Sequence, residues 1–186
     1  MPVELLTDEI SCALGTIVIA ARDGRLSSVD YGECRDRMMA LLAARYGAVD
    51  LHPMPDPFGL SGCIRAYLAG DLDAIDDIPV ETGGTPFQRQ VWSTLRRIPA
   101  GSTVTYADLA RDVGRPAATR AVGTINGRNP VAIVVPCHRV IGRDASLTGY
   151  AGGLWRKRWL LGHEGVVRPM SLKGEEAKAQ TEISQI

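Results

Sequence analysis

The chain has 186 residues, 45% of them hydrophobic, and no formal net charge. This composition predicts a globular protein with a sizeable core, and the length allows either one large domain or two small ones. No apolar run approaches the length that crosses a membrane, which excludes a membrane-spanning protein. The first residues, with Glu4, Asp8 and Glu9, lack the basic and apolar regions of a secretory signal, so we expect a cytoplasmic protein.

Charge is divided unevenly along the chain. Residues 1–80 hold 6 basic and 13 acidic side chains, whereas residues 81–165 hold 12 basic and 5 acidic ones. A positive domain joined to a negative one is typical of proteins that bind nucleic-acid phosphates with one part. We therefore expect an N-terminal domain at 1–80, a polar linker at 81–84, a C-terminal domain at 85–165 and a flexible tail at 166–186.

The N-terminal part predicts strands first and helices later. Residues 17–21 and 26–31 flank a turn at 22–25 and indicate a β-hairpin. Helices are expected from residue 33 to 46 and from 59 to 69. No group of residues in this part has catalytic spacing, so we expect it to act as a scaffold.

The C-terminal part opens with strong helix signals. Thr85 is a helix cap with proline next to it, and Gln88 completes a capping box. Thr105 and Asp108 form a second box, and a third helix is expected to start at Pro116 with an apolar face of Ala118, Ala121, Val122 and Ile125. Two short helices joined by a tight turn have the form of a helix-turn-helix.

On the third helix, Arg120 projects opposite the apolar face. Its neighbours on that outer face are the small residues Pro116, Gly123 and Gly127, which let a helix backbone approach a nucleic-acid groove. We interpret Arg120 as a side chain that inserts into the base stack of DNA or binds its phosphates. The alternative is an ordinary solvated arginine.

The most informative motif surrounds Cys137. The β-branched run 131–135 predicts a buried strand, and Pro136 ends it, so that Cys137 falls where the chain leaves the strand beside a pocket. The adjacent His138 is expected to lower the pKa of the thiol and make it a nucleophile. The alternative is a small buried hydrophobic residue.

The other cysteines give no comparable signal. Cys12, Cys34 and Cys63 are widely spaced, which predicts free thiols in a reducing compartment. With His52 they make four potential zinc ligands. Their separations fit no ligand-pair pattern, so we expect no metal and no cofactor.

Several blocks of residues occur in a characteristic order between positions 85 and 165. They are 85–88, 91–92, 98–101, 105–106, 109–110, 120–123, 129–130, 136–142, 149–150, 152–154 and 163–165. Together they resemble the O⁶-alkylguanine-DNA alkyltransferases, also called methylated-DNA-protein-cysteine methyltransferases. The resemblance implies an α/β (α+β) fold, with a small antiparallel sheet and helices of ribonuclease H-like type before a mostly helical domain.

The resemblance also implies an activity. A protein of this family repairs DNA by direct reversal, through irreversible transfer of the alkyl group of O⁶-alkylguanine to a cysteine, with O⁴-alkylthymine as a second candidate substrate. The partner implied is double-stranded DNA, bound through its minor groove with the damaged nucleotide flipped out. Flipping is needed because the alkyl group lies inside the base stack. No membrane and no obligate protein partner are implied, and we expect a monomer.

Roles for single residues follow from matching positions in the family. Cys137 would be the nucleophile and permanent alkyl acceptor, His138 its base through a water molecule, and Glu164 the group that orients His138. Tyr106 would hydrogen-bond the guanine, and Arg120 would fill the space of the flipped nucleotide.

The remaining roles concern the pocket and the DNA-binding helix. Tyr150, the backbone N–H of Ala151 and the carbonyls of Cys137 and Val140 would bind the base. Asn129 would tie the recognition helices to the active-site turn. Gly123 would lie in the DNA-binding helix.

Two other classes of protein fit parts of the sequence. A cysteine hydrolase would use Cys137, His138 and Glu164 as a triad, but it needs no helix-turn-helix. A non-catalytic DNA-binding module would use the same helices without the thiol. Periodicity alone places Tyr106 in the core, and Glu164 alone is indistinguishable from a surface acid.

Overall fold

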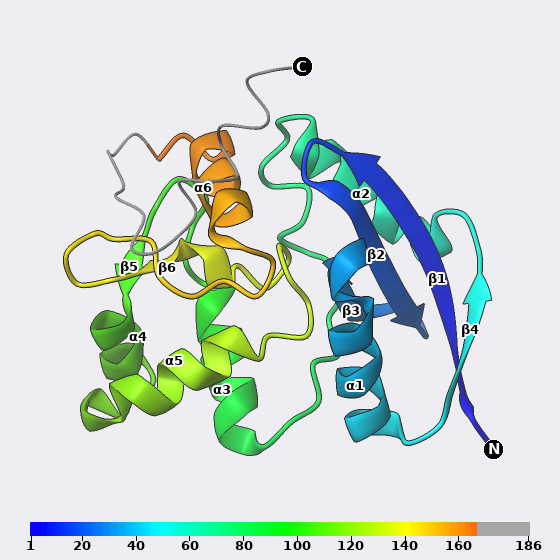
Figure 1. Cartoon of the computed structure of the whole chain (residues 1–186), viewed down its shortest axis with the longest axis horizontal. Coiled ribbons are helices and arrows are strands. Elements are labelled where there is room, and N and C mark those ends of the chain that lie inside the picture. Colours follow the sequence, from blue (N-terminus) through cyan, green and yellow to red (C-terminus); the bar gives the residue numbers. More distant parts are fainter. Residues whose placement is uncertain (167–186) are drawn as a thin grey trace.

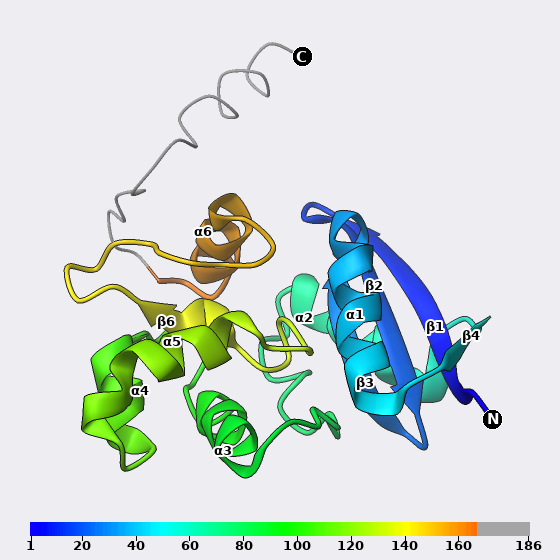
Figure 2. The same ribbon diagram turned by 60° about the horizontal axis from the view of Figure 1, so that its bottom comes forward.

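The computed structural model describes residues 1–166 of the chain. Figure 1 shows two lobes, a twisted sheet with its helices and a second lobe built mainly of helices. Figure 2 shows α1 (Arg35–Tyr46) lying along one face of the sheet. No helix in this part of the chain is long and apolar enough to span a membrane. The tail expected at 166–186 lies, apart from residue 166, outside the described residues.

The sheet lobe contains four strands in the order β3-β2-β1-β4. The strands are β1 (Val3–Cys12), β2 (Gly15–Arg22), β3 (Arg25–Tyr31) and β4 (Val49–Pro53). The hairpin predicted around residues 22–25 is confirmed, since β2 and β3 pair antiparallel. The pairing of β1 with β4 is parallel, so the sheet is mixed at that edge instead of antiparallel throughout.

Helices pack on both faces of this sheet. A 3₁₀ turn (Gly32–Cys34) leads into α1 (Arg35–Tyr46), and a second (Pro57–Gly59) leads into α2 (Leu60–Leu68), close to the predicted bounds. Met38 and Leu42 of α1 pack against one face of the sheet, and α2 packs on the other. The sheet residues on the second face share one apolar core with the helical lobe.

The helical lobe starts where its caps predicted. α3 (Pro86–Leu95) and α4 (Tyr106–Asp112) both begin with complete capping boxes, at Thr85 and Thr105. A 3₁₀ turn (Pro116–Ala118) precedes α5 (Thr119–Gly127), which packs across α4 as a helix-turn-helix should. The predicted apolar face of α5 is partly wrong, because Ala121 is exposed and Asn126 is buried in its place.

The last elements surround Cys137. A 3₁₀ turn (Cys137–Arg139) is followed by β6 (Val140–Ile141), which pairs in parallel with β5 (Val104–Thr105). A long loop then leads to α6 (Leu154–His163).

The strand predicted at 131–135 is wrong, although all five residues are buried. The segment is a tight turn in which the Val135 N–H donates to the Val131 carbonyl at 2.9 Å, and Ile133 has a positive φ of 71°. Only Val131 forms a bridge, with Val29 of β3. The run is apolar because the turn is inserted between the lobes, not because it belongs to a sheet.

The turn joins the lobes through backbone hydrogen bonds. Val29 of β3 donates to the Pro130 carbonyl at 3.0 Å and accepts from the Ala132 N–H at 2.9 Å. The end of β3 therefore holds the turn at residues 130–136, which we call the active-site turn because Cys137 follows it.

Candidate active site

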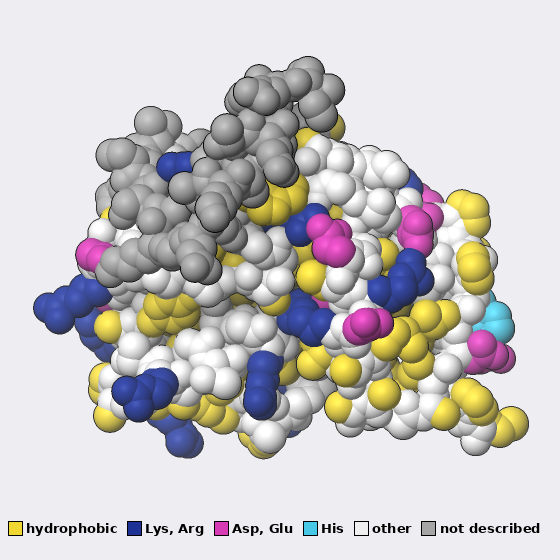
Figure 3. All heavy atoms as spheres, in the orientation of Figure 1, with side chains coloured by type: hydrophobic (Ala, Val, Ile, Leu, Met, Phe, Trp, Pro, Cys, Tyr) yellow, Lys and Arg dark blue, Asp and Glu magenta, His cyan; other side chains and the backbone are white. Residues whose placement is uncertain are grey.

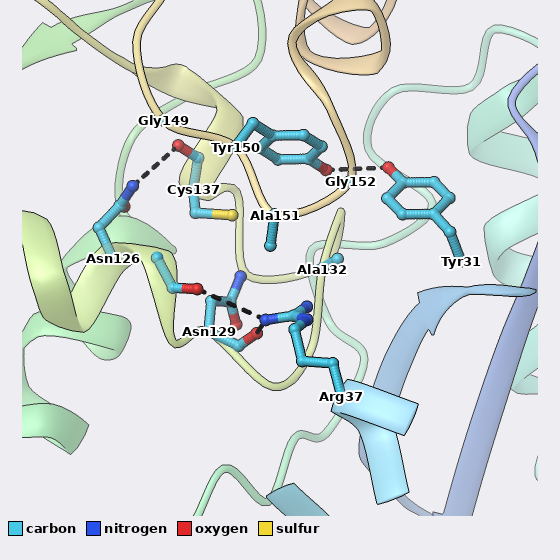
Figure 4. A pocket seen from close by; sticks show the side chains of 11 residues that line it. Tyr31, Arg37, Asn126, Asn129, Ala132, Cys137, Gly149, Tyr150, Ala151 and Gly152 are labelled. Carbon is cyan, nitrogen blue, oxygen red and sulfur yellow. Dashed lines mark hydrogen bonds between the residues drawn. The ribbon is translucent and has the colours of Figure 1, made fainter. Parts of the chain in front are cut away.

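A narrow pocket lies where the two lobes meet, with Cys137 in its lining (Figure 4). Its cavity volume is about 10 Å³, which is room for roughly one water molecule. A purine therefore enters only when lining side chains move apart. The lining residues are Tyr31, Arg37, Asn126, Gly127, Asn129, Ala132, Cys137, Gly149, Tyr150, Ala151 and Gly152.

Cys137 begins a 3₁₀ turn and is 7% exposed. Its carbonyl accepts a hydrogen bond from Asn126 Nδ2 at 3.4 Å, and its sulfur is turned toward Ala151 and away from Asn126 (Figure 4). Burial raises the pKa of the thiol, although Asn129 and Lys157 act in the opposite direction. The expectation of a lowered thiol pKa is therefore wrong for the DNA-free protein, and the thiol needs a base to remove its proton.

His138 lies next to Cys137 and is completely buried. Its Nε2 is 2.9 Å from Glu164 Oε1. Burial lowers the pKa of His138, more than the Glu164 carboxylate raises it, which leaves the imidazole neutral near pH 7.

The protonation state of Glu164 decides the tautomer of His138. Burial would raise the pKa of this carboxyl, but hydrogen bonds from His138 and Arg139 outweigh it and hold the pKa well below its usual range. An ionised carboxylate only accepts, so Nε2 of a neutral His138 carries the proton and Nδ1 holds a lone pair. Nδ1 is buried and has no hydrogen-bond partner among residues 1–166. His138 is thus a neutral imidazole whose unprotonated nitrogen has no protein partner among these residues.

Glu164 is held by three further donors from different parts of the chain. Arg139 Nη2 lies 2.8 Å from Oε1 and its Nε lies 3.0 Å from Oε2. Tyr67, from α2 of the sheet lobe, donates its hydroxyl to Oε1 at 2.7 Å. Because a buried carboxylate stays charged only when it is paired and hydrogen-bonded, these contacts keep Glu164 ionised and fixed in place.

Asn129 follows α5 and fixes the turn before Cys137. Its Oδ1 accepts from the Val131 N–H at 2.9 Å, and its Nδ2 donates to the Val135 carbonyl at 2.7 Å. One buried amide thus replaces the strand partners that this segment lacks. It connects the end of α5 directly with the active-site turn.

Tyr106 and Val140 lie beside the pocket and outside its lining. The Tyr106 hydroxyl donates to the Thr148 carbonyl at 3.1 Å, and its ring packs against Gly123 of α5. The buried Lys157 amine donates to the carbonyls of Val140 at 2.6 Å and Thr148 at 2.8 Å. Burial lowers the pKa of Lys157 to about 8.

Tyr150 and Ala151 are in the pocket lining, on the loop before α6. The Tyr150 hydroxyl is 2.9 Å from the Tyr31 hydroxyl of β3. Burial raises the pKa of Tyr150, so its hydroxyl stays protonated and able to donate.

The helical lobe carries most of the exposed positive charge. Figure 3 shows Lys and Arg side chains gathered over this lobe, whereas most of the visible Asp and Glu side chains lie over the sheet lobe. Arg120 is exposed on α5, as the helix projection predicted, and it does not line the pocket. Further exposed arginines of this lobe are Arg89, Arg97, Arg111, Arg115, Arg128, Arg143 and Arg158.

Sequence reasoning missed the contribution of the sheet lobe. Tyr31 and Arg37 line the pocket, and Tyr67 contacts Glu164. Nothing in their local sequence marks them, because each acts through contacts with residues about a hundred positions away. Within residues 1–166, no three His, Cys, Asp or Glu side chains gather in a way that would hold a metal ion.

A neutral buried base beside a buried thiol, next to a positively charged helix-turn-helix, defines a DNA-binding protein with nucleophilic cysteine chemistry. Comparison with known proteins identifies the family within this class. Residues 86–166 match the family described as 6-O-methylguanine DNA methyltransferase, DNA binding domain. The chain belongs to the methylated-DNA–protein-cysteine methyltransferase family.

Two curated relatives illustrate the similarity. A methylated-DNA–protein-cysteine methyltransferase of Shigella flexneri is 51% identical over 87% of this chain and 96% of its own length. One of Salmonella typhi is 49% identical over the same shares.

Solved structures agree with the fold. Mycobacterium tuberculosis OGT in complex with DNA superposes with a TM-score of 0.72 at 37% identity, covering 87% of this chain and 92% of that one. The O⁶-methylguanine-DNA methyltransferase of Pyrococcus kodakaraensis gives a TM-score of 0.69 at 29% identity, covering 87% and 99%.

Proposed function

We propose that this DNA-repair methyltransferase removes the alkyl group of O⁶-alkylguanine from duplex DNA and retains it on Cys137. The observation that carries the proposal is the buried pair of His138 and ionised Glu164 immediately after Cys137, with Nδ1 of His138 unpartnered. In such a pair the carboxylate orients the imidazole, and the imidazole can act as the general base that accepts the proton of the thiol.

The proposed step is a displacement at the alkyl carbon. His138 Nδ1 takes the thiol proton through a water molecule, and the sulfur electron pair forms a bond to carbon. The carbon–oxygen bond breaks, and guanine leaves with that electron pair on O6 and is then protonated. A thioether does not hydrolyse, so each molecule acts once.

The base would be held by groups beside the thiol. The Val140 carbonyl accepts from Lys157, and a carbonyl has a second lone pair that could accept from the guanine amine. The Cys137 carbonyl accepts from the Val140 N–H and, at 3.4 Å, from Asn126 Nδ2, so the guanine amine would replace the long bond from Asn126. Tyr150, the Ala151 N–H and Tyr106 would contact the ring. Tyr106 would do so by exchanging its bond to Thr148 for one to the base.

Extrusion of the nucleotide would depend on α5. Flipping a paired base costs a few kcal/mol. Arg120 is exposed on α5, and its insertion into the minor groove would repay part of that cost. Gly123 of the same helix would contribute by letting the Tyr106 ring pack closely against α5. Asn129 would transmit the position of α5 to the active-site turn.

Coarser features belong to the same proposal. Residues 1–80 would be a supporting domain, 81–84 the linker, and 85–165 the domain that binds DNA and performs transfer. The protein would act as a cytoplasmic monomer, where its four free thiols stay reduced. O⁴-alkylthymine would be a second substrate.

The test is to expose the protein to a duplex containing one O⁶-methylguanine and map the product by peptide mass. We expect one methyl group per molecule, on Cys137, and none on Cys137→Ser, which still binds the duplex. A methyl group on Cys12, Cys34 or Cys63 would contradict the assignment. Repeated turnover would indicate a hydrolase instead.

A further inference from the structure

The sheet lobe forms one wall of the pocket. Tyr31, the last residue of β3, lines the pocket with Cys137, and it is 1% exposed. Figure 4 shows the Cys137 sulfur turned toward the side where Ala151, Tyr150 and Tyr31 lie. The carbonyl of Cys137 is on the other side, bonded to Asn126. Tyr31 therefore lines the side of the pocket toward which the sulfur is turned, with Tyr150 between them in this view.

Tyr31 is fixed in this position from several directions. The Arg156 guanidinium lies 4.2 Å from the centre of the Tyr31 ring. Arg156 is itself buried and donates to the carbonyls of Leu14 at 2.8 Å and Gly152 at 2.7 Å. The Tyr31 hydroxyl bonds to Tyr150 at 2.9 Å.

Gly152 shows how closely the ring is packed. A Cβ at this position would collide with the Tyr31 ring. The backbone on that side therefore lies directly against the Cδ2–Cε2 edge of the ring. Moving the ring would break its contacts with Arg156 and Gly152 together.

Tyr31 and the loop at residues 149–152 differ in how readily their backbones move. Residues 149–152 belong to a loop. Tyr31, in contrast, ends the strand β3, in which Val29 forms backbone hydrogen bonds with the turn that precedes Cys137. When a base enters the narrow pocket, the loop gives way more readily than the strand. The Tyr31 ring, which is still held by its strand and by Arg156 of α6, is then the part of the lining that keeps its place.

We propose that Tyr31 determines the size of the alkyl group that reaches Cys137. This inference rests on the proposed function. With the ring in place, the pocket accepts methyl and ethyl groups and disfavours a benzyl group, which needs the space the ring fills. Tyr31 is a specificity-determining residue supplied by the lobe that does not bind DNA.

The test compares single-turnover rates on two duplexes, one with O⁶-methylguanine and one with O⁶-benzylguanine. Comparing the benzyl-to-methyl rate ratio between variants cancels the intrinsic reactivity of the two groups. Tyr31→Ala should raise this ratio at least about tenfold, because one methylene's worth of space in an apolar pocket already changes discrimination by about that factor. Tyr31→Phe, which keeps the ring, should change the ratio less than about twofold.

Two more variants make the test decisive. Tyr31→Leu is measured in parallel, since it opens the pocket while keeping an apolar side chain in the core. Tyr46→Ala removes a half-buried tyrosine of α1 away from the pocket and should leave the ratio unchanged. An unchanged ratio in Tyr31→Ala and Tyr31→Leu, with methyl transfer retained, would overturn the inference. Failure of the wild-type protein to methylate Cys137 would instead overturn the proposed function.

Discussion

The two lobes contribute to one pocket in different ways. The helical lobe supplies the thiol, the base and the exposed arginines from segments that are short and close in sequence. The sheet lobe supplies Tyr31 and Tyr67, which lie about a hundred residues from the groups they contact. The chemistry is thus local in sequence, whereas the walls and the support of the site are not. Variants in each lobe should therefore have different signatures.

The largest effect is expected inside the helical lobe. Glu164→Gln removes the charge that orients His138 and stabilises its protonated form, so the rate of Cys137 methylation should fall about a hundredfold, the usual contribution of a positioned base. Single-turnover kinetics on an O⁶-methylguanine duplex would measure it. The matched change Glu9→Gln, at an exposed ion pair of β1 with Arg35, should leave the rate unaltered. Equal rates for Glu164→Gln and wild type would remove Glu164 from the mechanism.

The next variant tests whether the sheet lobe stabilises Glu164 of the helical lobe. Tyr67→Phe deletes the hydroxyl that donates to buried Glu164, and a hydrogen bond to a charged group contributes about 1.5–3 kcal/mol. The free energy of unfolding, from urea titration, should fall by that amount. Tyr46→Phe removes a half-buried hydroxyl bonded to Ser27 and to the solvent-exposed carboxylate of Glu81. It should cost about 1 kcal/mol or less, because water solvates that carboxylate when the hydroxyl is removed. A smaller loss for Tyr67 than for Tyr46 would show that the lobes are not coupled through Glu164.

Arg120 separates DNA handling from chemistry within the helical lobe. Arg120→Ala should slow transfer from the duplex about tenfold, since part of the flipping cost is no longer repaid. Transfer from free O⁶-methylguanine base should be unchanged, because no nucleotide is extruded. Arg22→Ala, at an exposed site on the sheet lobe, should leave both rates as they are. A proportional loss on both substrates would assign Arg120 to folding or to the pocket.

A smaller effect concerns pH. Burial lowers the pKa of His138, so below about pH 6.5 the unfolded chain binds a proton that the folded protein does not. Stability should therefore decrease as the pH falls from 7 toward 5, by up to about 1.4 kcal/mol per unit. Urea titrations at several pH values would measure this slope. The slope should be flatter in His138→Asn, and an equal slope would mean that other groups cause it.

The same contrast explains what the sequence could predict. Capping boxes at Thr85 and Thr105 are complete within four residues, and the hairpin at 22–25 is equally local, so these elements were found. The sequence does not predict the inner strand β1 or the edge strand β4, because mixed polar and apolar residues form a strand only when partner strands are present.

Other errors have the same origin. The run 131–135 predicts a strand because an apolar, β-branched run does not distinguish a strand from a buried turn. Asn129 supplies the hydrogen bonds that make the turn possible. Cys137 and His138 were identified from their motif. The rise in the thiol pKa depends on how the folded protein buries Cys137, which a motif does not encode.

The central claim is that a neutral His138, with its proton on Nε2 and a lone pair on Nδ1, is the base for a protonated Cys137 in the resting protein. Nitrogen-15 NMR of protein labelled in its histidine rings, assigned with His138→Asn, measures this directly. At pH 7 we predict one protonated and one unprotonated ring nitrogen for His138, with the proton on Nε2. Two protonated nitrogens, the sign of an imidazolium beside a thiolate, would contradict the account.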